Sequence, residues 1–164
     1  MPLSLLSLSI MDRAREICAE IASLLEDEQI DVINAIKTNL TAVSPMRGEP
    51  IDCVIWVPAD KVEGNSYNPN VVSPPEFRLL KHSIEKNGFA MPVVTWPTNG
   101  HYEIVDGFHR GKVGAKDKAI RKRLRGYLPI TFLNPDRYSE PDRMAATIEF
   151  NRARGKHQVQ GMSE

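Results

Sequence analysis

Apolar positions in the first part of the chain recur at the spacing of one face of an α-helix, first in residues 11–25 and again in residues 30–40. The acidic run at residues 26–28 interrupts this pattern, so it predicts an N-terminal helical hairpin over residues 11–44. Prolines and a glycine in residues 44–50 then end the helical pattern. We expect the hairpin to serve in docking or in forming a homodimer.

The rest of the chain changes to short apolar runs bounded by turn residues, which is typical of strands alternating with helices. Residues 59–72 are a long polar segment, and we expect a loop that is functional rather than idle. Ser73 and Glu76, with two prolines between them, predict a capping box. The predicted strands are residues 52–58, 92–96, 101–105 and 127–133, and the predicted helices are residues 73–87, 108–118 and a segment from 139 onward.

The charge of the chain is balanced overall but uneven along the sequence. The 164 residues carry 21 basic and 21 acidic side chains, so the composition argues neither for nor against a nucleic-acid partner. Between Arg110 and Arg125, however, Asp117 is the only acidic residue. Such a run is either a solvated face or a surface for a polyanion, and nonspecific DNA contact through Lys112–Arg125 is one hypothesis. The basic residues of the run are Arg110, Lys112, Lys116, Lys118, Arg121, Lys122, Arg123 and Arg125.

The two cysteines and the first ten residues carry little chemistry. Cys18 and Cys53 lie in different segments without zinc-ligand spacing, so neither a zinc site nor a disulfide framework is indicated. Residues 1–10 are apolar but lack a basic start and a cleavage site, and they are too short to span a membrane. We expect a flexible or start-site extension at residues 1–10 and a cytoplasmic protein.

The stretch from Ile104 to Arg110 carries the candidate chemistry. A predicted strand ends at Asp106-Gly107, which is turn chemistry, and a basic helix start follows. The backbone N–H groups of a helix's first turn bind anions, and a glycine lets the backbone approach a phosphate closely. His109 and Arg110 offer further donors in the same turn. The alternative is an ordinary helix that Asp106 caps.

Three local stretches resemble the ParB/sulfiredoxin-fold superfamily. They are Asn68-Pro69-Asn70 before a helix, residues 84–94, which read IEKNG and then MPVV, and residues 102–110, which read YEIVDGFHR. The resemblance covers residues 52–155 and leaves residues 156–164 as a tail. It implies an α+β fold, a small mixed sheet with helices, here preceded by the helical hairpin.

Within this superfamily, the closest resemblance is to the ParB-like immunoglobulin-binding regulator B (IbrB-like) group, because residues 151–157 read NRARGKH. This group implies a nucleotide-binding regulatory protein of the transcriptional co-activator type, associated with prophages or mobile elements. It also implies a partner that is similar to phosphoadenosine-phosphosulfate reductase.

The superfamily resemblance also implies a ligand and the residues that hold it. Superfamily members hold nucleotide phosphates at the glycine turn, so ATP, ADP or CTP with Mg²⁺ is the implied cofactor. A second element, Ile148-Glu149-Phe150-Asn151-Arg152, resembles the stretch that carries an acid, an amide and an arginine to the triphosphate. Asp106 and Asn151 are the candidate Mg²⁺ ligands. The candidate nucleotide-binding residues are Asp106, Gly107, Phe108, His109, Arg110, Asn68, Asn151 and Arg152.

Departures from the family patterns decide between activities. Sulfiredoxin has its catalytic cysteine where this chain has Phe108, so sulfiredoxin chemistry is not expected. ParB has the sequence GERR where this chain has residues 107–110, GFHR. The free-serine kinase branch has DGHHR, which keeps a phosphotransferase, nucleotidyltransferase or nucleotide hydrolase as an alternative, with Glu63 or Glu149 as the base. A nonspecific DNA-associated nuclease is the second alternative.

Overall fold

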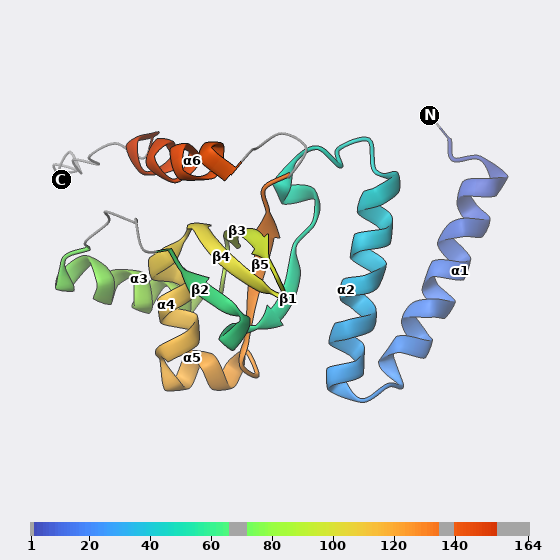
Figure 1. Cartoon of the computed structure of the whole chain (residues 1–164). Helices are drawn as coiled ribbons and strands as arrows, with labels where there is room; N and C mark the ends of the chain where they lie inside the picture. Colours follow the sequence, from blue (N-terminus) through green and yellow to red (C-terminus); the bar gives the residue numbers. More distant parts are fainter. Residues whose placement is uncertain (1, 66–71, 135–139, 154–164) are drawn as a thin grey trace, which may run out of the picture. The chain divides into compact units, whose positions relative to one another are not determined.

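The chain consists of two compact units, residues 1–44 and 45–164. A computed structural model describes residues 2–65, 72–134 and 140–153 (Figure 1). The predicted tail at 156–164 lies outside the described residues. Within the described part of the chain, no helix is both long enough and apolar enough to cross a bilayer.

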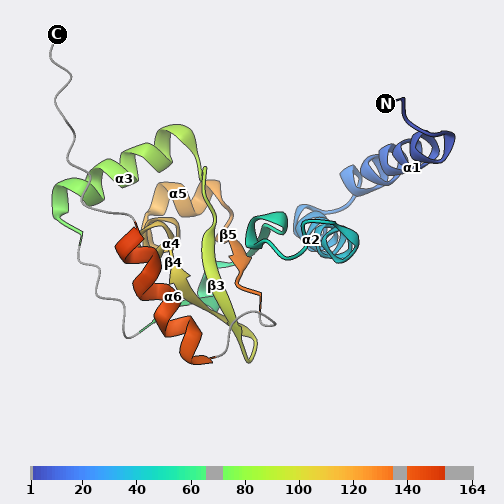
Figure 2. The same ribbon diagram turned by 90° about the horizontal axis from the view of Figure 1, so that it is seen from above.

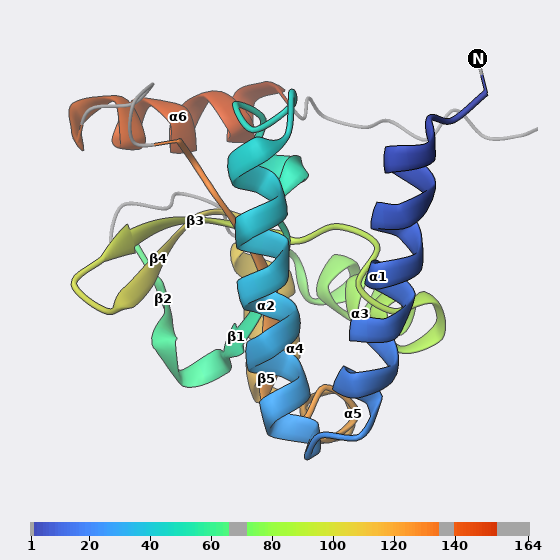
Figure 3. The same cartoon turned by 90° about the vertical axis from the view of Figure 1, so that its right-hand side faces the viewer.

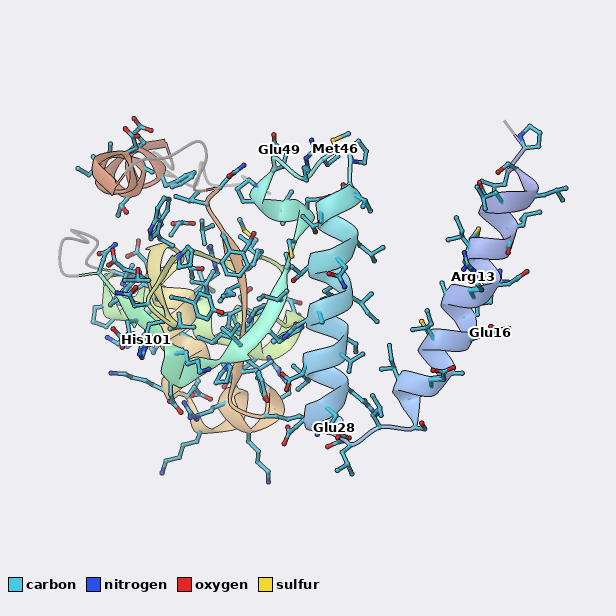
Figure 4. The ribbon with its side chains drawn as sticks, turned by 45° about the vertical axis from the view of Figure 1, so that its right-hand side comes forward. Arg13, Glu16, Glu28, Met46, Glu49 and His101 are labelled. Carbon is cyan, nitrogen blue, oxygen red and sulfur yellow. The ribbon has the colours of Figure 1, made fainter. Side chains whose placement is uncertain are left out.

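The first unit is a pair of helices, α1 (Leu5–Ala22) and α2 (Glu26–Val43). Residues 5–10, expected to belong to a flexible or start-site extension, lie in α1, which starts where the Ser4 side chain accepts from the Ser7 N–H. The acidic residues 26–28 are not a break but the first turn of α2, where carboxylates oppose the positive end of the helix dipole. Glu28, labelled in Figure 4 at the start of α2, accepts from the Leu25 N–H at 3.2 Å.

The second unit is built on a five-stranded mixed sheet in the order β1-β5-β3-β4-β2. The pairs β1–β5 and β3–β4 are antiparallel, and the pairs β3–β5 and β2–β4 are parallel. This sheet with its helices confirms the predicted α+β fold class. The strands are β1 (Ile55–Pro58), β2 (Val62–Gly64), β3 (Val93–Thr98), β4 (His101–Asp106) and β5 (Tyr127–Phe132).

The helices of this unit are α3 (Pro74–Asn87), α4 (Phe108–Lys116), α5 (Lys118–Arg123) and α6 (Glu140–Ala153). Helix α3 begins at the predicted capping box, with Ser73 and Glu76 bonded to each other, and ends at Gly88. The helix predicted over residues 108–118 ends at Lys116 instead. It ends there because the Asp117 side chain accepts from the N–H groups of Ala119 and Ile120 and starts α5.

The predicted polar loop at residues 59–72 contains structure that the pattern did not reveal. A short 3-10 turn, η2 (Ala59–Lys61), leads into β2, which pairs with β4. Three residues are too few to show the alternation of a strand, so the sequence concealed it. A second 3-10 turn, η1 (Pro50–Asp52), delays the start of β1 from residue 52 to residue 55.

Neighbouring strand residues alternate between the two faces of the sheet. One face carries the buried Val93, Ile104 and Ile130, and α4 packs on it at Gly111, where a Cβ would lie 3.0 Å from Ile104 Cδ1. The other face carries Val105 and Leu133, which form one buried cluster with Ala146 of α6. Helices α5 and α6 lie at opposite ends of the sheet (Figures 1 and 2).

Strands β3 and β4 form the predicted hairpin, whose turn extends beyond the neighbouring strands (Figure 3). Asn99 and Gly100 have positive φ angles of 42° and 87°, as tight hairpin turns require. Strand β4 therefore begins at this turn, with His101, and runs to Asp106 at its far end. The candidate site lies at the Asp106 end.

Candidate phosphate-binding site

Helix α4 begins immediately after β4, through a single linking residue. Gly107 is buried, has φ 88° and ψ 23°, and is the N-cap of α4, with no side chain capping the helix. The Gly111 N–H donates to the Gly107 carbonyl at 2.9 Å, which makes the first helical bond. The N–H groups before Gly111 have no carbonyl to meet within the helix, so the start of α4 favours an anion. The alternative that Asp106 caps this helix is wrong, because Gly107 occupies the cap position.

The Arg110 side chain forms hydrogen bonds with residues around the turn. Its Nη2 donates to Asp106 Oδ2 at 3.2 Å and to the Pro92 carbonyl at 3.1 Å. The side chains of Arg110 and Asp106 are 15% and 9% exposed, so this ion pair is largely shielded from water. Both residues therefore brace the turn between β4 and α4, and Asp106 faces a cation of the protein itself.

His109 lies between two aromatic rings. The Phe108 ring is 5.4 Å away and the Phe77 ring of α3 is 6.3 Å away, both edge to face. The Lys112 ammonium lies 5.6 Å above the Phe77 ring, within the range of a cation–π contact. Phe77 and Lys112 were not predicted as neighbours of the turn. A signal existed for Lys112 only, because a residue four positions after Phe108 lies on the same side of the helix.

The side chain of Phe108, the first residue of α4, packs against β2. Its ring lies against Gly64, where a Cβ would come within 2.5 Å of Phe108 Cε2. Phe108 is also packed against the main core. Phe108 is thus a packing residue, and the contact joins the end of β2 to the beginning of α4.

Glu63, one of the two candidate bases, lies away from this turn. Glu63 lies opposite Glu103 in the β2–β4 pair, four residues before Gly107, or about 13 Å along the strand. Its Oε1 lies 3.2 Å from His101 Nδ1, at the hairpin end of β4 (Figure 4). Glu149 is exposed on α6.

The second predicted element lies in α6. Asn151 and Arg152 are in the last turn of this helix, which packs through Ala146 against Val105, the neighbour of Asp106. The structure therefore brings α6 to the strand that carries the glycine turn. Asn68 lies outside the described residues.

Asp106, one of the two predicted Mg²⁺ ligands, already has a cation of the protein as its partner. Asp106 is paired with Arg110, and the described residues contain no group of three or more His, Cys, Asp and Glu side chains that could hold a metal ion. Mg²⁺ that accompanies a nucleotide takes most of its ligands from phosphates and water. A Mg²⁺ ion here would accordingly be brought by the nucleotide.

In the basic run from Arg110 to Arg125, some side chains are bonded to other parts of the fold and others are exposed. Arg121 donates to both oxygens of Asp60, and Arg123 donates to the last carbonyls of α3, those of Ile84 and Glu85, at 2.8 Å each. These arginines are structural. Lys116, Lys118 and Lys122 are exposed, and no ion pair of theirs occurs among the described residues.

Asp117, the only acidic residue of the run, is also used in the fold. Its Oδ2 lies 2.8 Å from Lys81 Nζ of α3. The hydrogen bond from Lys81, with those from the Ile120 and Ala119 N–H groups, lowers the pKa of Asp117 below its ordinary value. The same hydrogen bond to Asp117 raises the pKa of Lys81.

No protein-family model matches the chain. The uncharacterized protein YbdM of Escherichia coli (strain K12) is 50% identical to it over 145 residues, 88% of this chain and 68% of YbdM.

Among solved structures, the C-terminally truncated chromosome-partitioning protein ParB from Caulobacter crescentus, complexed with CTP-gamma-S, matches with a TM-score of 0.50 and 19% identity. That match covers 63% of this chain and 55% of the ParB chain. A sulfiredoxin from Arabidopsis thaliana matches with a TM-score of 0.38 and 16% identity over 48% of this chain. The ParB match shows the fold: the described part of the second unit has a ParB/sulfiredoxin-like arrangement, as the sequence predicted.

Proposed function

The chain belongs to the same family as YbdM of Escherichia coli, and we propose that it is a ParB-like nucleotide-binding regulatory protein that holds nucleotide phosphates at the start of α4. One observation carries this proposal: α4 begins at a buried, left-handed glycine with no side-chain cap. This glycine permits the left-handed backbone from which α4 starts, and the start of a helix favours a phosphate. The ParB structure of similar fold contains a bound nucleotide analogue, CTP-gamma-S, which supports the same ligand class here.

The side chains around the turn have separate roles in this proposal. Arg110 and Asp106 hold the shape of the turn through their ion pair. His109 and Lys112 both contact the Phe77 ring of α3. They supply the polar and cationic groups that bind phosphate oxygens. In the described part of the site, Lys112 thus takes the direct electrostatic role that the sequence assigned to Arg110.

The regulatory part of the proposal is supported by the sequence resemblance and by the first unit. Neither α1 nor α2 contains a fully buried residue, and apolar side chains such as Leu5, Ile17 and Leu40 are exposed. A helical hairpin with this surface suits a docking role. The co-activator role and the partner similar to phosphoadenosine-phosphosulfate reductase rest on the resemblance of the DGFHR and NRARGKH stretches alone.

An enzymatic role has less support than binding. A base must come within hydrogen-bond distance of the proton it removes. Glu63 is held by His101 at the opposite end of β4, and Glu149 is exposed on α6. We therefore propose nucleotide binding as the function and assign no catalytic base for nucleotide turnover.

The test is a thermal-shift panel of ATP, ADP, AMP, CTP and GTP, with and without Mg²⁺, followed by calorimetry on every nucleotide that shifts the melting temperature. Saturation at one hundred times the dissociation constant stabilises the folded state by about 2.7 kcal/mol. Gly107→Ala should abolish the shift. The matched control is Gly100→Ala, because Gly100 has nearly the same φ of +87° but lies in the hairpin turn with nothing within 4 Å. Binding that survives Gly107→Ala, or no binding by the wild type, would overturn the proposal.

A further inference from the structure

Asn65 directly follows β2 and reaches across to β4. Its Nδ2 donates to the carbonyl oxygen of Ile104 at 2.7 Å, and the preceding Gly64 is paired with Ile104 in the parallel β2–β4 ladder. The side chain therefore lies beside the last part of β4, two residues before Asp106. Asn65 was not predicted as a site residue, although the pair Gly64-Asn65 is turn chemistry.

The other end of the Asn65 amide is unsatisfied. Asn65 Oδ1 is buried and has no hydrogen-bond partner in the described structure. Buried polar atoms are almost always paired, so an unpaired one requires an explanation. Exchanging the amide's O and N does not provide one, because Oδ1 would then face the Ile104 carbonyl, acceptor against acceptor. The orientation with Nδ2 toward the Ile104 carbonyl therefore holds, and the group left over is Oδ1, a hydrogen-bond acceptor.

The residue before Asn65 packs against the start of α4. Gly64, the neighbour of Asn65, touches the ring of Phe108, the first residue of that helix. The N–H groups at the start of α4 are donors, which suit phosphate oxygens. A phosphate oxygen is itself an acceptor, so it cannot satisfy Asn65 Oδ1. The ligand group that pairs with Asn65 must instead carry an O–H or N–H.

We propose that Asn65 is a further binding residue of this site, and that its Oδ1 accepts a hydrogen bond from the nucleoside part of the bound nucleotide. This inference rests on the proposed function. A nucleotide carries such donors as ribose hydroxyls and as the exocyclic amino group of adenine or cytosine. Asn65 thus distinguishes a nucleoside triphosphate from inorganic tripolyphosphate, which offers the same phosphates without a donor.

The experiment pairs changes in Asn65 with changes in the ligand. Calorimetry measures the affinity of wild type, Asn65→Ala and Asn65→Asp for ATP, CTP and inorganic tripolyphosphate. Two further arms distinguish the donors: the 2′-deoxy and 3′-deoxy nucleotides lack one hydroxyl each, while purine riboside triphosphate and zebularine triphosphate lack the amino group. Circular dichroism checks that each variant is folded.

The wild type should bind the nucleotide that carries the donor about 3- to 10-fold more tightly than the analogue that lacks it, as one neutral hydrogen bond implies. Asn65→Ala should lose this preference and keep its affinity for tripolyphosphate. Asn65→Asp keeps an acceptor but loses the donor to Ile104. It should therefore restore the preference if Oδ1 contacts the ligand, and should fail if Asn65 only ties β2 to β4.

Two results separate failure of this inference from failure of the proposed function. If Asn65→Ala keeps the full preference, or weakens tripolyphosphate as much as nucleotide, Asn65 does not contact the nucleoside and the inference is wrong while phosphate binding stands. If the wild type binds neither nucleotide nor tripolyphosphate, the proposed function fails and the inference fails with it.

Discussion

The guanidinium of Arg110 lies directly over Gly107: a Cβ built on Gly107 would come 2.8 Å from Arg110 Nη2. The absence of a side chain at position 107 therefore has two effects. It permits the left-handed backbone at φ 88°, and it leaves the space in which Arg110 reaches Asp106. The geometry of the turn and the Arg110–Asp106 ion pair depend on the same glycine.

Gly107→Ala should accordingly cost more stability than the left-handed backbone alone explains. That backbone costs a non-glycine residue about 1–2 kcal/mol. Gly100→Ala pays only this cost, since nothing lies within 4 Å of the added Cβ, whereas Gly107→Ala must also displace Arg110. Urea unfolding of the two variants measures the difference. Equal losses at the two positions would show that Arg110 moves aside freely.

Replacing Arg110 should act on folding as well as on ligand binding. Removing one partner of a shielded ion pair costs about 3–5 kcal/mol when it leaves the other charge buried, and Asp106 is 9% exposed. We expect Arg110→Met to approach the lower end of this range. The double variant Asp106→Asn, Arg110→Met should be more stable than Arg110→Met alone, because no uncompensated charge remains. A thermodynamic cycle over the four proteins gives the coupling, and strictly additive effects would contradict the ion pair's role.

Substitutions of the lysines and of the arginines in the basic run should have different effects. Lys118→Glu with Lys122→Glu should leave stability within about 0.5 kcal/mol of wild type, as for exposed side chains without partners. If the run contacts nucleic acid, these two changes should remove salt-sensitive retention on DNA. Arg123→Ala should instead destabilise by about 1–2 kcal/mol, because the Glu85 carbonyl loses the Arg123 donor and the Ile84 carbonyl keeps only the Gly88 N–H. DNA retention that the lysine variant keeps would identify the run as a solvated face.

The glycine turn could be predicted from the sequence, but the side-chain interactions around it could not. A strand followed by Asp106-Gly107 and a basic helix start can be identified locally, and the structure has β4 and α4 on either side of that glycine. The interactions of Arg121 and Arg123 could not be predicted, because their partners lie far away in the chain. Arg121 meets Asp60 across 61 residues, and Arg123 meets Ile84 across 39.

Strand β2 escaped prediction for a different reason. Val62–Gly64 has too few residues for an alternating pattern, and its strand character comes from pairing with β4. The placement of Asn65 beside Ile104 depends on that pairing, so the sequence could not show it. The same pairing separates Glu63 from the glycine turn, because it sets Glu63 level with Glu103. Predicting either position required the register of a parallel strand pair.

Acid should destabilise the second unit through Asp117. Its pKa in the folded protein is lowered from 3.8, first by the hydrogen bond from Lys81. The unfolded chain therefore takes up a proton at higher pH than the folded chain. The stabilisation is present above about pH 4 and is lost as the pH falls through the lowered pKa. The unfolding free energy of wild type should thus decline below pH 4.

Asp117→Asn retains an oxygen that caps α5. This variant should be less stable than wild type at pH 7 but should lose less stability on acidification. Lys81→Met removes the main cause of the shift and should flatten the profile similarly. Urea titrations at pH 7, 4 and 3 test this, and parallel profiles for all three proteins would show that the Lys81–Asp117 hydrogen bond does not contribute to folding.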